Sequence, residues 1–410
     1  MKFPLPSMLF VFGLLATGTV FFLYDLDVTA DDANTPAGPD LAGLKVETEE
    51  LSQKLYDKTS RHRLIAIDYE LSESHSPEIS KHREKVLRLL AESADEDAIQ
   101  YVRSVFETDS EHRDEAAYAL SEYAQLKPSD LHIWRFLIRS LTVVEGPQAV
   151  SVMKALARYR QRATNSRWIR RVILIGLKLP EADLPVAIKL LEHWTGVSVA
   201  SLPQQKVAAT DLRPSKETLA RYQAWFRDKW PDELDPSWPK LPESSRWTYE
   251  EMHKKLSPLV FTAENIERGK LVYNKASCAK CHKKGDVGEK FGPDLSDIAG
   301  LRQRKEILEA ILFPNLELNE DYPTVTVLTV SGKTYSGLMS AGKQDAIQII
   351  GNDGKTNQIE KDDIELILPS KLSNMPAAAL EPLTFQEICD LLAYLEHRIN
   401  PKTPFHKPSE

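Results

Sequence analysis

The sequence predicts a mainly α-helical protein in which a row of amphipathic helices precedes a smaller C-terminal domain with a short antiparallel sheet. Two patterns predict this. Apolar residues recur at helical spacing in successive segments from about Ser76 to Trp194, whereas residues 324–368 alternate with a period of two between glycine-containing turns. The length of 410 residues agrees, because a chain of this size usually forms several domains.

Composition limits the classes of partner. The chain is 42% hydrophobic and 27% charged, with a formal net charge of -8, as expected of a soluble protein. An acidic balance without a long basic run argues against nucleic acid as the main partner. Three cysteines are too few for a disulfide framework.

The N-terminus departs from this average. The run MLFVFGLLATGTVFFLY, residues 8–24, contains no charge. It is long for a signal-peptide core and slightly short for a membrane span, and small residues at 28–30 would allow cleavage. Residues 1–30 are therefore predicted to be a signal peptide or a membrane anchor. Either would export the chain to the periplasm or another extracytoplasmic space.

The small, polar start of residues 31–75 predicts a linker.

Residues 76–195 are predicted to form a helical-repeat domain. In HREKVLRLLAESA, the side chains of Val86, Leu89 and Leu90 lie on one helical face. Similar patterns occur at 96–107, 111–126, 130–143, 147–162, 167–178 and 183–194. Such short, one-sided helices must stack on their neighbours, and the pairs resemble HEAT-like repeats. No strict period is present, so an irregular helical bundle is the alternative. The Trp- and Pro-rich residues 196–258 are predicted to be a connector packed against this domain.

The predicted C-terminal domain spans residues 259–400, with a short tail at 401–410. One helix is expected at 262–275 and another at 302–313, followed by four or five strands within a β insertion at 323–368. A last helix opens with the capping box Thr384–Glu387 and ends before Asn400.

The stretch NKASCAKCHKKGD within this domain contains the candidate site residues Cys278, Cys281 and His282. Structural zinc usually takes four ligands from paired motifs, and no second Cys-x-x-Cys is present. A redox dithiol requires a strand-to-helix junction, but the local pattern here is helix, loop, helix. In a third reading, the two thiols bind a haem covalently and the histidine ligates its iron. This reaction occurs outside the cytoplasm, which agrees with the predicted export.

Combined motifs over residues 262–399 resemble a c-type cytochrome, in particular the haem-binding C-terminal domain common in planctomycete and verrucomicrobial proteins. The motifs are Cys-x-x-Cys-His, GPDL at 292–295, a helix ending at Phe313-Pro314, SGK and DGK turns, Met-Pro at 375–376, and DLLAYL.

The resemblance implies one covalent haem c, held by Cys278 and Cys281. His282 would be the proximal iron ligand, with its Nδ1–H donated to the carbonyl of Pro293, and Met375 would be the distal ligand. It also implies that Gly269 and Tyr273 on one helix meet Leu391, Tyr394 and Leu395 on the last helix.

Other residues could supply the distal ligand. Met339 lies in a strand pattern, His397 late on the last helix and His406 in the tail, so each is a weaker candidate than Met375. Cys389, beside apolar residues of the last helix, is predicted to be a buried, inert thiol.

The sequence therefore predicts an exported monohaem cytochrome that transfers single electrons and is not an enzyme. Its helical repeats would dock a redox protein, and the β insertion would be separable from the haem site. One alternative is a haem enzyme of the peroxidase kind or the electron-accepting subunit of a periplasmic dehydrogenase. Another is that the helical domain has the main function and haem is an accessory. No dinucleotide-binding, hydrolase or metalloprotease motif supports an enzyme.

Overall fold

The structure is a computed structural model that describes residues 40–72, 76–202, 215–342 and 345–399. The predicted signal or anchor at 1–30 and the tail at 401–410 lie outside these residues. Among the residues described, no helix is both long enough and apolar enough to cross a membrane.

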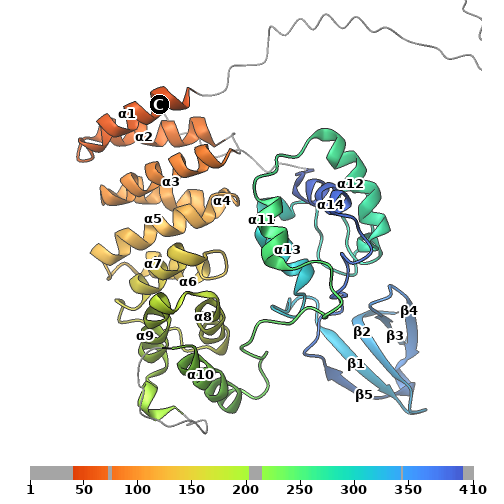
Figure 1. Cartoon of the computed structure of the whole chain (residues 1–410). Helices are drawn as coiled ribbons and strands as arrows, with labels where there is room; N and C mark the ends of the chain where they lie inside the picture. The colour runs from red at the N-terminus through yellow and green to blue at the C-terminus, as the bar shows by residue number, and fades with distance from the viewer. Residues whose placement is uncertain (1–39, 73–75, 203–214, 343–344, 400–410) are drawn as a thin grey trace, which may run out of the picture. The chain divides into compact units, whose positions relative to one another are not determined.

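The N-terminal part is a stack of helices that follow one another in chain order (Figure 1). Their bounds are α1 Leu41–Ser52, α2 Lys58–Leu71, α3 Pro77–Glu92, α4 Glu96–Thr108, α5 Arg113–Leu126, α6 Leu131–Ser140, α7 Gly146–Leu156, α8 Ser166–Lys178, α9 Leu184–Thr195 and α10 Lys216–Lys229. Several begin with a side chain that accepts a hydrogen bond from the first turn, such as Asp95 before α4 and Asp130 before α6. The predicted helices from residue 76 onward are present, although the ranges 130–143 and 147–162 are too long, because α6 ends at Ser140 and α7 ends at Leu156.

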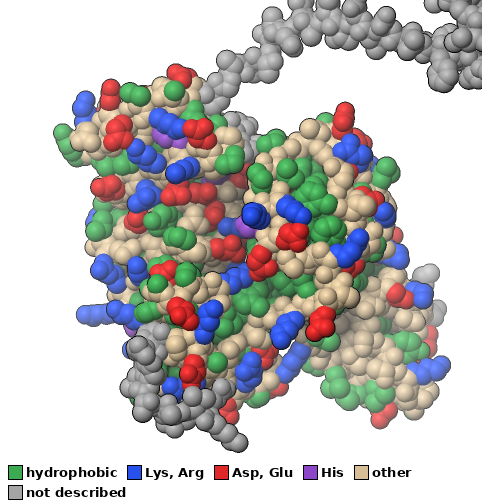
Figure 2. Space-filling view, viewed as in Figure 1, with side chains coloured by type: hydrophobic (Ala, Val, Ile, Leu, Met, Phe, Trp, Pro, Cys, Tyr) green, Lys and Arg blue, Asp and Glu red, His purple; other side chains and the backbone are tan. Residues whose placement is uncertain are grey.

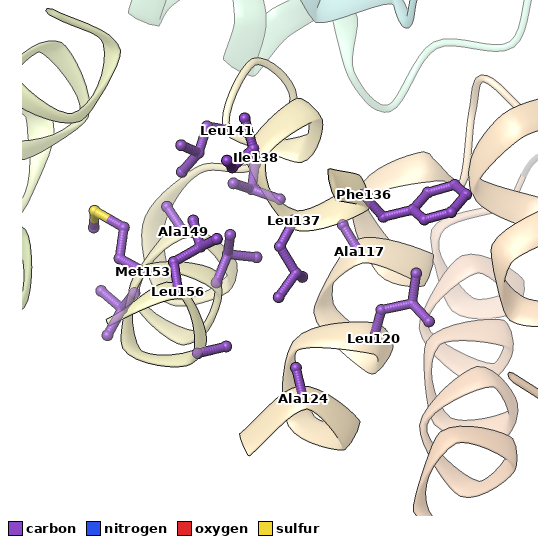
Figure 3. Packing of buried hydrophobic residues seen from close by; sticks show 14 of the residues in the cluster. Ala117, Leu120, Ala124, Phe136, Leu137, Ile138, Leu141, Ala149, Met153 and Leu156 are labelled. Carbon is purple, nitrogen blue, oxygen red and sulfur yellow. The ribbon is translucent and has the colours of Figure 1, made fainter. Parts of the chain in front are cut away.

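The stack has one continuous hydrophobic core, built by the inward face of each helix. Figure 3 shows part of it, with Leu120 on α5, Leu137 on α6 and Met153 on α7, which are successive helices of the stack. All three side chains are fully buried. Neighbouring helices therefore supply each other's apolar contacts, as expected for helices that are too short to be stable alone.

The prediction that residues 31–75 form a linker is wrong for most of its length. Helices α1 and α2 cover residues 41–52 and 58–71. Leu64, Ile67 and Leu71 of α2 are fully buried in the core of the stack. Local composition masked these helices, because the polar, Pro- and Gly-containing residues that precede them dominate the N-terminal half of the segment.

The predicted connector at 196–258 does not behave as one segment. Its helix α10 completes the stack, where Leu219, Tyr222 and Phe226 are buried. Its second helix, α11 (Tyr249–Leu256), belongs instead to the core of the C-terminal domain. Trp238 lies between, since its indole N–H donates to Leu174 O of α8 at 2.9 Å while its ring contacts Phe313. The C-terminal domain therefore begins earlier than residue 259.

Four helices build the C-terminal core: α11, α12 (Ala263–Lys275), α13 (Arg304–Leu312) and α14 (Phe385–Glu396). The capping box at Thr384 is present, as predicted. Helices α12 and α14 cross at Gly269, where an added Cβ would lie 2.0 Å from Asp390 O and 2.6 Å from Tyr394 Cβ. Only glycine allows this approach, so the expected glycine contact between the two helices is confirmed.

The β insertion forms one antiparallel sheet of five strands in the order β4-β3-β2-β1-β5. The strands are β1 Thr324–Thr329, β2 Thr334–Ala341, β3 Ala346–Ile350, β4 Thr356–Glu360 and β5 Ile364–Pro369. The sheet has a small core of its own, formed by Val325, Val327, Ile349 and Ile359. Since Val325 pairs with Pro369, the two ends of the insertion lie side by side, as predicted.

Charged side chains of both signs are interspersed over the helical stack on the face seen in Figure 2. Some form surface ion pairs, such as Arg88 with Glu122 at 2.7 Å between α3 and α5. That face therefore lacks the single-sign basic area expected of a nucleic-acid-binding surface.

Candidate functional site

The candidate site begins where α12 ends. Ser277 has a positive φ of 63°, in the left-handed region, and turns the chain away from the helix axis. A short 3-10 turn, Cys278–Lys280, follows, and the amide of His282 donates to Cys278 O at 2.9 Å. This local winding places the two cysteines and the histidine on consecutive turns of one compact segment.

The imidazole of His282 has a defined orientation. Its Nδ1 lies 2.9 Å from Pro293 O, the contact expected from the GPDL segment. Because a carbonyl can only accept, Nδ1 must carry the proton and Nε2 must hold the lone pair. Burial lowers the pKa of His282, although the bond to Pro293 acts in the opposite direction. Burial therefore favours the neutral form of the ring, in which Nε2 is available as a ligand for a metal.

The loop from Lys283 to Leu295 wraps around this segment. Gly292 donates its N–H to Cys281 O at 2.7 Å, and Leu295 donates to Lys283 O at 2.8 Å. A Cβ added at Gly292 would lie 2.8 Å from His282 Cε1. The glycine backbone therefore lies directly against the imidazole ring, and a larger residue there would displace it.

Tyr273 links α12 to the histidine. Its side chain is fully buried, and its hydroxyl donates to His282 O at 2.7 Å. Its ring packs edge-on against that of Tyr394 of α14, with centroids 5.4 Å apart. The backbone of His282 is thus fixed from the helix crossing, while its side chain is fixed by Pro293.

The two thiols have the character of unactivated cysteines. Burial raises the pKa of Cys278 to about 11 and also raises the pKa of Cys281. Catalytic dithiols instead lower the pKa of one cysteine so that it is a thiolate at neutral pH. The environment therefore does not favour the redox-dithiol alternative. Among the described residues, no group of three or more His, Cys, Asp or Glu side chains could hold a metal ion, as a zinc centre would need.

Lys284 closes the loop on the side of α14. It is fully buried, and its Nζ donates to Leu295 O, Leu395 O and His397 O at 3.0–3.1 Å. Burial lowers the pKa of Lys284 to about 8, so the ammonium remains charged at neutral pH. Its three N–H groups match three carbonyls, two of them at the C-terminal end of α14.

Met375 lies on a separate loop and is half-buried. None of the hydrogen bonds in the described part of the chain joins it to His282 or to the cysteines. Its loop is fixed elsewhere: Ser373 N donates to Asn315 Oδ1 at 2.7 Å, and Asn374 Nδ2 donates to Ile350 O at 3.0 Å. The structure thus brings Cys278, Cys281, His282 and Pro293 together, and it places Met375 on a loop anchored to the sheet.

The other candidates for a distal ligand occupy different positions. Met339 is 45% exposed on β2. His397 is exposed at the end of α14, and His406 lies outside the described residues. Cys389 is buried on α14, as predicted, and burial raises its pKa.

Sequence reasoning missed three features of the site: the hydroxyl contact of Tyr273, the Gly292 backbone against the imidazole, and buried Lys284. The contacts of Tyr273 and Gly292 involve residues of recognised sequence motifs, so these motifs could have suggested them. Lys284 carries no such signal, because a lysine in the polar run HKKGD resembles a solvated one.

Residues 266–398 match the family model described as Cytochrome c. No curated protein matches the chain. The matched range contains Cys278, Cys281 and His282, and it includes the five-stranded sheet. The chain therefore contains a cytochrome c domain, preceded by a largely helical region. The match and the cysteine pair imply a covalent haem c, and the family implies electron transfer.

Proposed function

Starting from a cytochrome c domain at residues 266–398, we propose that the protein is a monohaem electron carrier. Cys278 and Cys281 would hold the haem, and His282 would ligate its iron through Nε2. The observation that carries the proposal is the 2.9 Å contact between His282 Nδ1 and Pro293 O within a Cys-x-x-Cys-His segment. It leaves one ring nitrogen with a fixed direction and a free lone pair.

The donor set fits this group. The two thiols are free, separated by two residues and only partly exposed, as the addition of each to one vinyl group of a haem would require. Cys278 and Ala279 pack against the apolar C-terminal core, which supplies a nonpolar surrounding. A haem bound here supplies reversible one-electron chemistry, and the protein tunes it through ligand identity and burial.

We assign the distal position to Met375. It lies on a loop rather than on a strand or at a helix end, and it precedes Pro376, as in the cytochrome c resemblance. A neutral thioether would favour ferrous iron and raise the reduction potential relative to a second histidine. In this assignment the protein has no open coordination site and is not an enzyme.

Export and partners form part of the same proposal. Covalent haem attachment takes place outside the cytoplasm, which agrees with the uncharged run at residues 8–24. We place the protein in the periplasm or another extracytoplasmic space, anchored or free. Its partners would be redox proteins, and the exposed faces of α1–α10 would provide docking area of the kind that helical repeats offer.

The primary test is covalent attachment. The full chain is expressed with a haem-maturation system, and haem is stained on a denaturing gel. The double variant Cys278→Ala/Cys281→Ala should lose the stain, because no thioether bond can form. Cys389→Ala, a buried cysteine outside the motif, should retain it. Stained protein from the double variant would refute the proposal.

The distal ligand is tested by spectroscopy on the haem-loaded protein. Met375→Ala should remove the weak far-red band of methionine-ligated ferric haem, allow cyanide to bind and lower the reduction potential. Met339→Ala, the matched control on β2, should do none of these. If the wild-type protein binds cyanide rapidly and turns over peroxide, the site is open and the haem-enzyme alternative is correct.

A further inference from the structure

One hairpin of the sheet contacts both loops that carry the proposed iron ligands. It consists of β3, β4 and the turn Gly351–Lys355 between them. Gly351 and Gly354 close the turn through the bond from Gly354 N to Gly351 O at 2.9 Å, and Gly354 has a positive φ of 76°. The DGK motif therefore builds a tight, defined turn, as glycine in the left-handed region allows.

The turn lies against the segment between the two cysteines. Lys280, the residue before Cys281, donates from Nζ to Asp353 O at 3.4 Å. A Cβ added at Gly354 would lie 2.8 Å from Lys280 Cδ and 3.1 Å from Lys280 Cβ. The aliphatic stem of the lysine thus packs on the glycine while its ammonium binds the neighbouring carbonyl.

The same hairpin holds the Met375 loop through its first strand. Asn374 Nδ2 donates to Ile350 O at 3.0 Å, and Ile350 is buried at the last position of β3. Asn374 directly precedes Met375. The main chain of Met375 is also held, because its N–H donates to the hydroxyl of Ser373 at 3.1 Å. The two anchor points on the hairpin, Ile350 O and Asp353 O, are only three residues apart in sequence.

We infer that the β3–β4 hairpin sets the separation of the two ligand loops and that Asn374 is the positioning residue for Met375. The inference rests on the proposed function, since it assigns a role toward haem. It differs from the expectation that the β insertion is separable from the haem site, because it gives the insertion a role in placing Met375. A strand cannot shift by a fraction of a residue, because its ladder of hydrogen bonds fixes its register. The Met375 loop, which is bonded to β3 through Asn374, is therefore held at a fixed position relative to the strand.

The expected effect of an Asn374 substitution on the binding of Met375 to iron can be estimated from the loss of the hydrogen bond between Asn374 Nδ2 and Ile350 O. Removing the amide donor leaves the carbonyl of a buried residue without this partner and frees the residue next to Met375. The fraction of molecules with the methionine detached should then rise about tenfold, which is the usual consequence of losing one such bond. An external ligand that binds only the detached form gains affinity by the same factor.

The experiment uses the full haem-loaded chain and cyanide as the probe. Asn374→Ala removes the donor, and Asn374→Asp keeps the shape of the side chain but replaces the donor with oxygen. Asn357→Ala, an exposed asparagine on β4 of the same hairpin, is the control. Covalent haem content, the far-red band, the reduction potential and the cyanide affinity of the ferric protein are measured for each.

Both Asn374 variants should keep full covalent haem, show a weaker far-red band and a lower potential, and bind cyanide about tenfold more tightly than the Asn357 variant. Unchanged cyanide affinity and an unchanged band would overturn the inference. Loss of haem attachment in the Asn374 variants alone would also overturn it, because the residue would then serve folding rather than ligand positioning. If the wild-type protein itself lacks covalent haem or the methionine band, the proposed function fails instead.

Discussion

At the scale of single residues, the site is set by backbone groups as much as by side chains. Pro293 O orients the imidazole of His282, and the hydroxyl of Tyr273 binds the carbonyl of the same histidine. Gly292 leaves room for the ring. The position of His282 therefore depends on three neighbours. The carbonyl of Pro293 orients its ring, the hydroxyl of Tyr273 binds its backbone, and the absence of a side chain at Gly292 provides space for the ring.

Lys284 should contribute to stability far more than a lysine usually does. Its ammonium satisfies three backbone carbonyls, and Lys284→Met would leave all three without that donor in a buried place. We expect the free energy of unfolding to fall by roughly 3 kcal/mol, measured by urea denaturation.

The neighbouring Lys283 provides the control. Its ammonium lies 3.8 Å from the carboxylate of Asp294, and both side chains are partly exposed to solvent. Lys283→Met should therefore change the stability by less than about 0.5 kcal/mol. If both variants lost the same free energy of unfolding, the buried hydrogen bonds of Lys284 would not contribute more to stability than the exposed ion pair of Lys283.

At the scale of elements, the crossing of α12 and α14 is the fixed frame of the C-terminal domain. The backbone of Gly269 touches α14, and Asp390 of α14 accepts from Arg268 at 2.9 Å and from Asn265 at 2.7 Å. These contacts surround the glycine with polar bonds. The loop with the cysteines leaves α12 directly, so the orientation of this helix determines where the loop lies.

The sheet is the second element that matters for the site. Residues 324–369 can be replaced by a short loop, because Val325 and Pro369 are paired neighbours. We expect the shortened protein to attach haem through Cys278 and Cys281, since α12 and α14 remain. It should lose most of the far-red band, because Asn374 and Lys280 lose their partners on the hairpin.

Haem staining and absorption spectra of the shortened chain measure both outcomes. A full far-red band would mean that the insertion is only a spacer, as the sequence suggested. The stabilising effect of the sheet should appear separately, as a lower midpoint of thermal unfolding.

At the scale of the whole molecule, the helical stack and the C-terminal domain are joined by specific bonds. Arg113 Nη1 donates to Leu301 O at 2.8 Å, and Gln303 Nε2 donates to Glu111 O at 3.0 Å. Lys305 Nζ lies 2.8 Å from Asp114 Oδ2, and both side chains are largely buried. The start of α5 is thus used within the chain, so a partner protein would have to dock on other faces of the stack.

The Asp114–Lys305 pair should behave as a buried ion pair. Burial alone would lower the pKa of Lys305, but the charge of Asp114 outweighs it and the pKa is raised. Asp114→Ala would leave a buried ammonium unpaired, and we expect it to cost roughly 3 kcal/mol of stability in urea unfolding. The double variant Asp114→Ala/Lys305→Met should recover much of this loss, because the ammonium that lost its partner is removed as well. Additive losses would indicate that the two residues do not interact.

The sequence by itself determined what depends on neighbours in the chain. Helical periodicity located α3 to α9, two-residue alternation located the sheet, and the capping box located the start of α14. The Cys-x-x-Cys-His and GPDL motifs identified Cys278, Cys281, His282 and Pro293, because a short loop returns the proline carbonyl to the histidine within eleven residues.

Only the tertiary structure decided the contacts between distant segments. Lys280 meets Asp353 across 73 residues, Lys284 meets His397 across 113, and Asn374 meets Ile350 from another element. It also assigned α1, α2 and α10 to the stack and α11 to the C-terminal core. Local patterns limit backbone conformation, but the partner of a polar side chain depends on which surfaces are packed together. That packing is a property of the whole fold, which is why a buried lysine and a solvated one look alike in sequence.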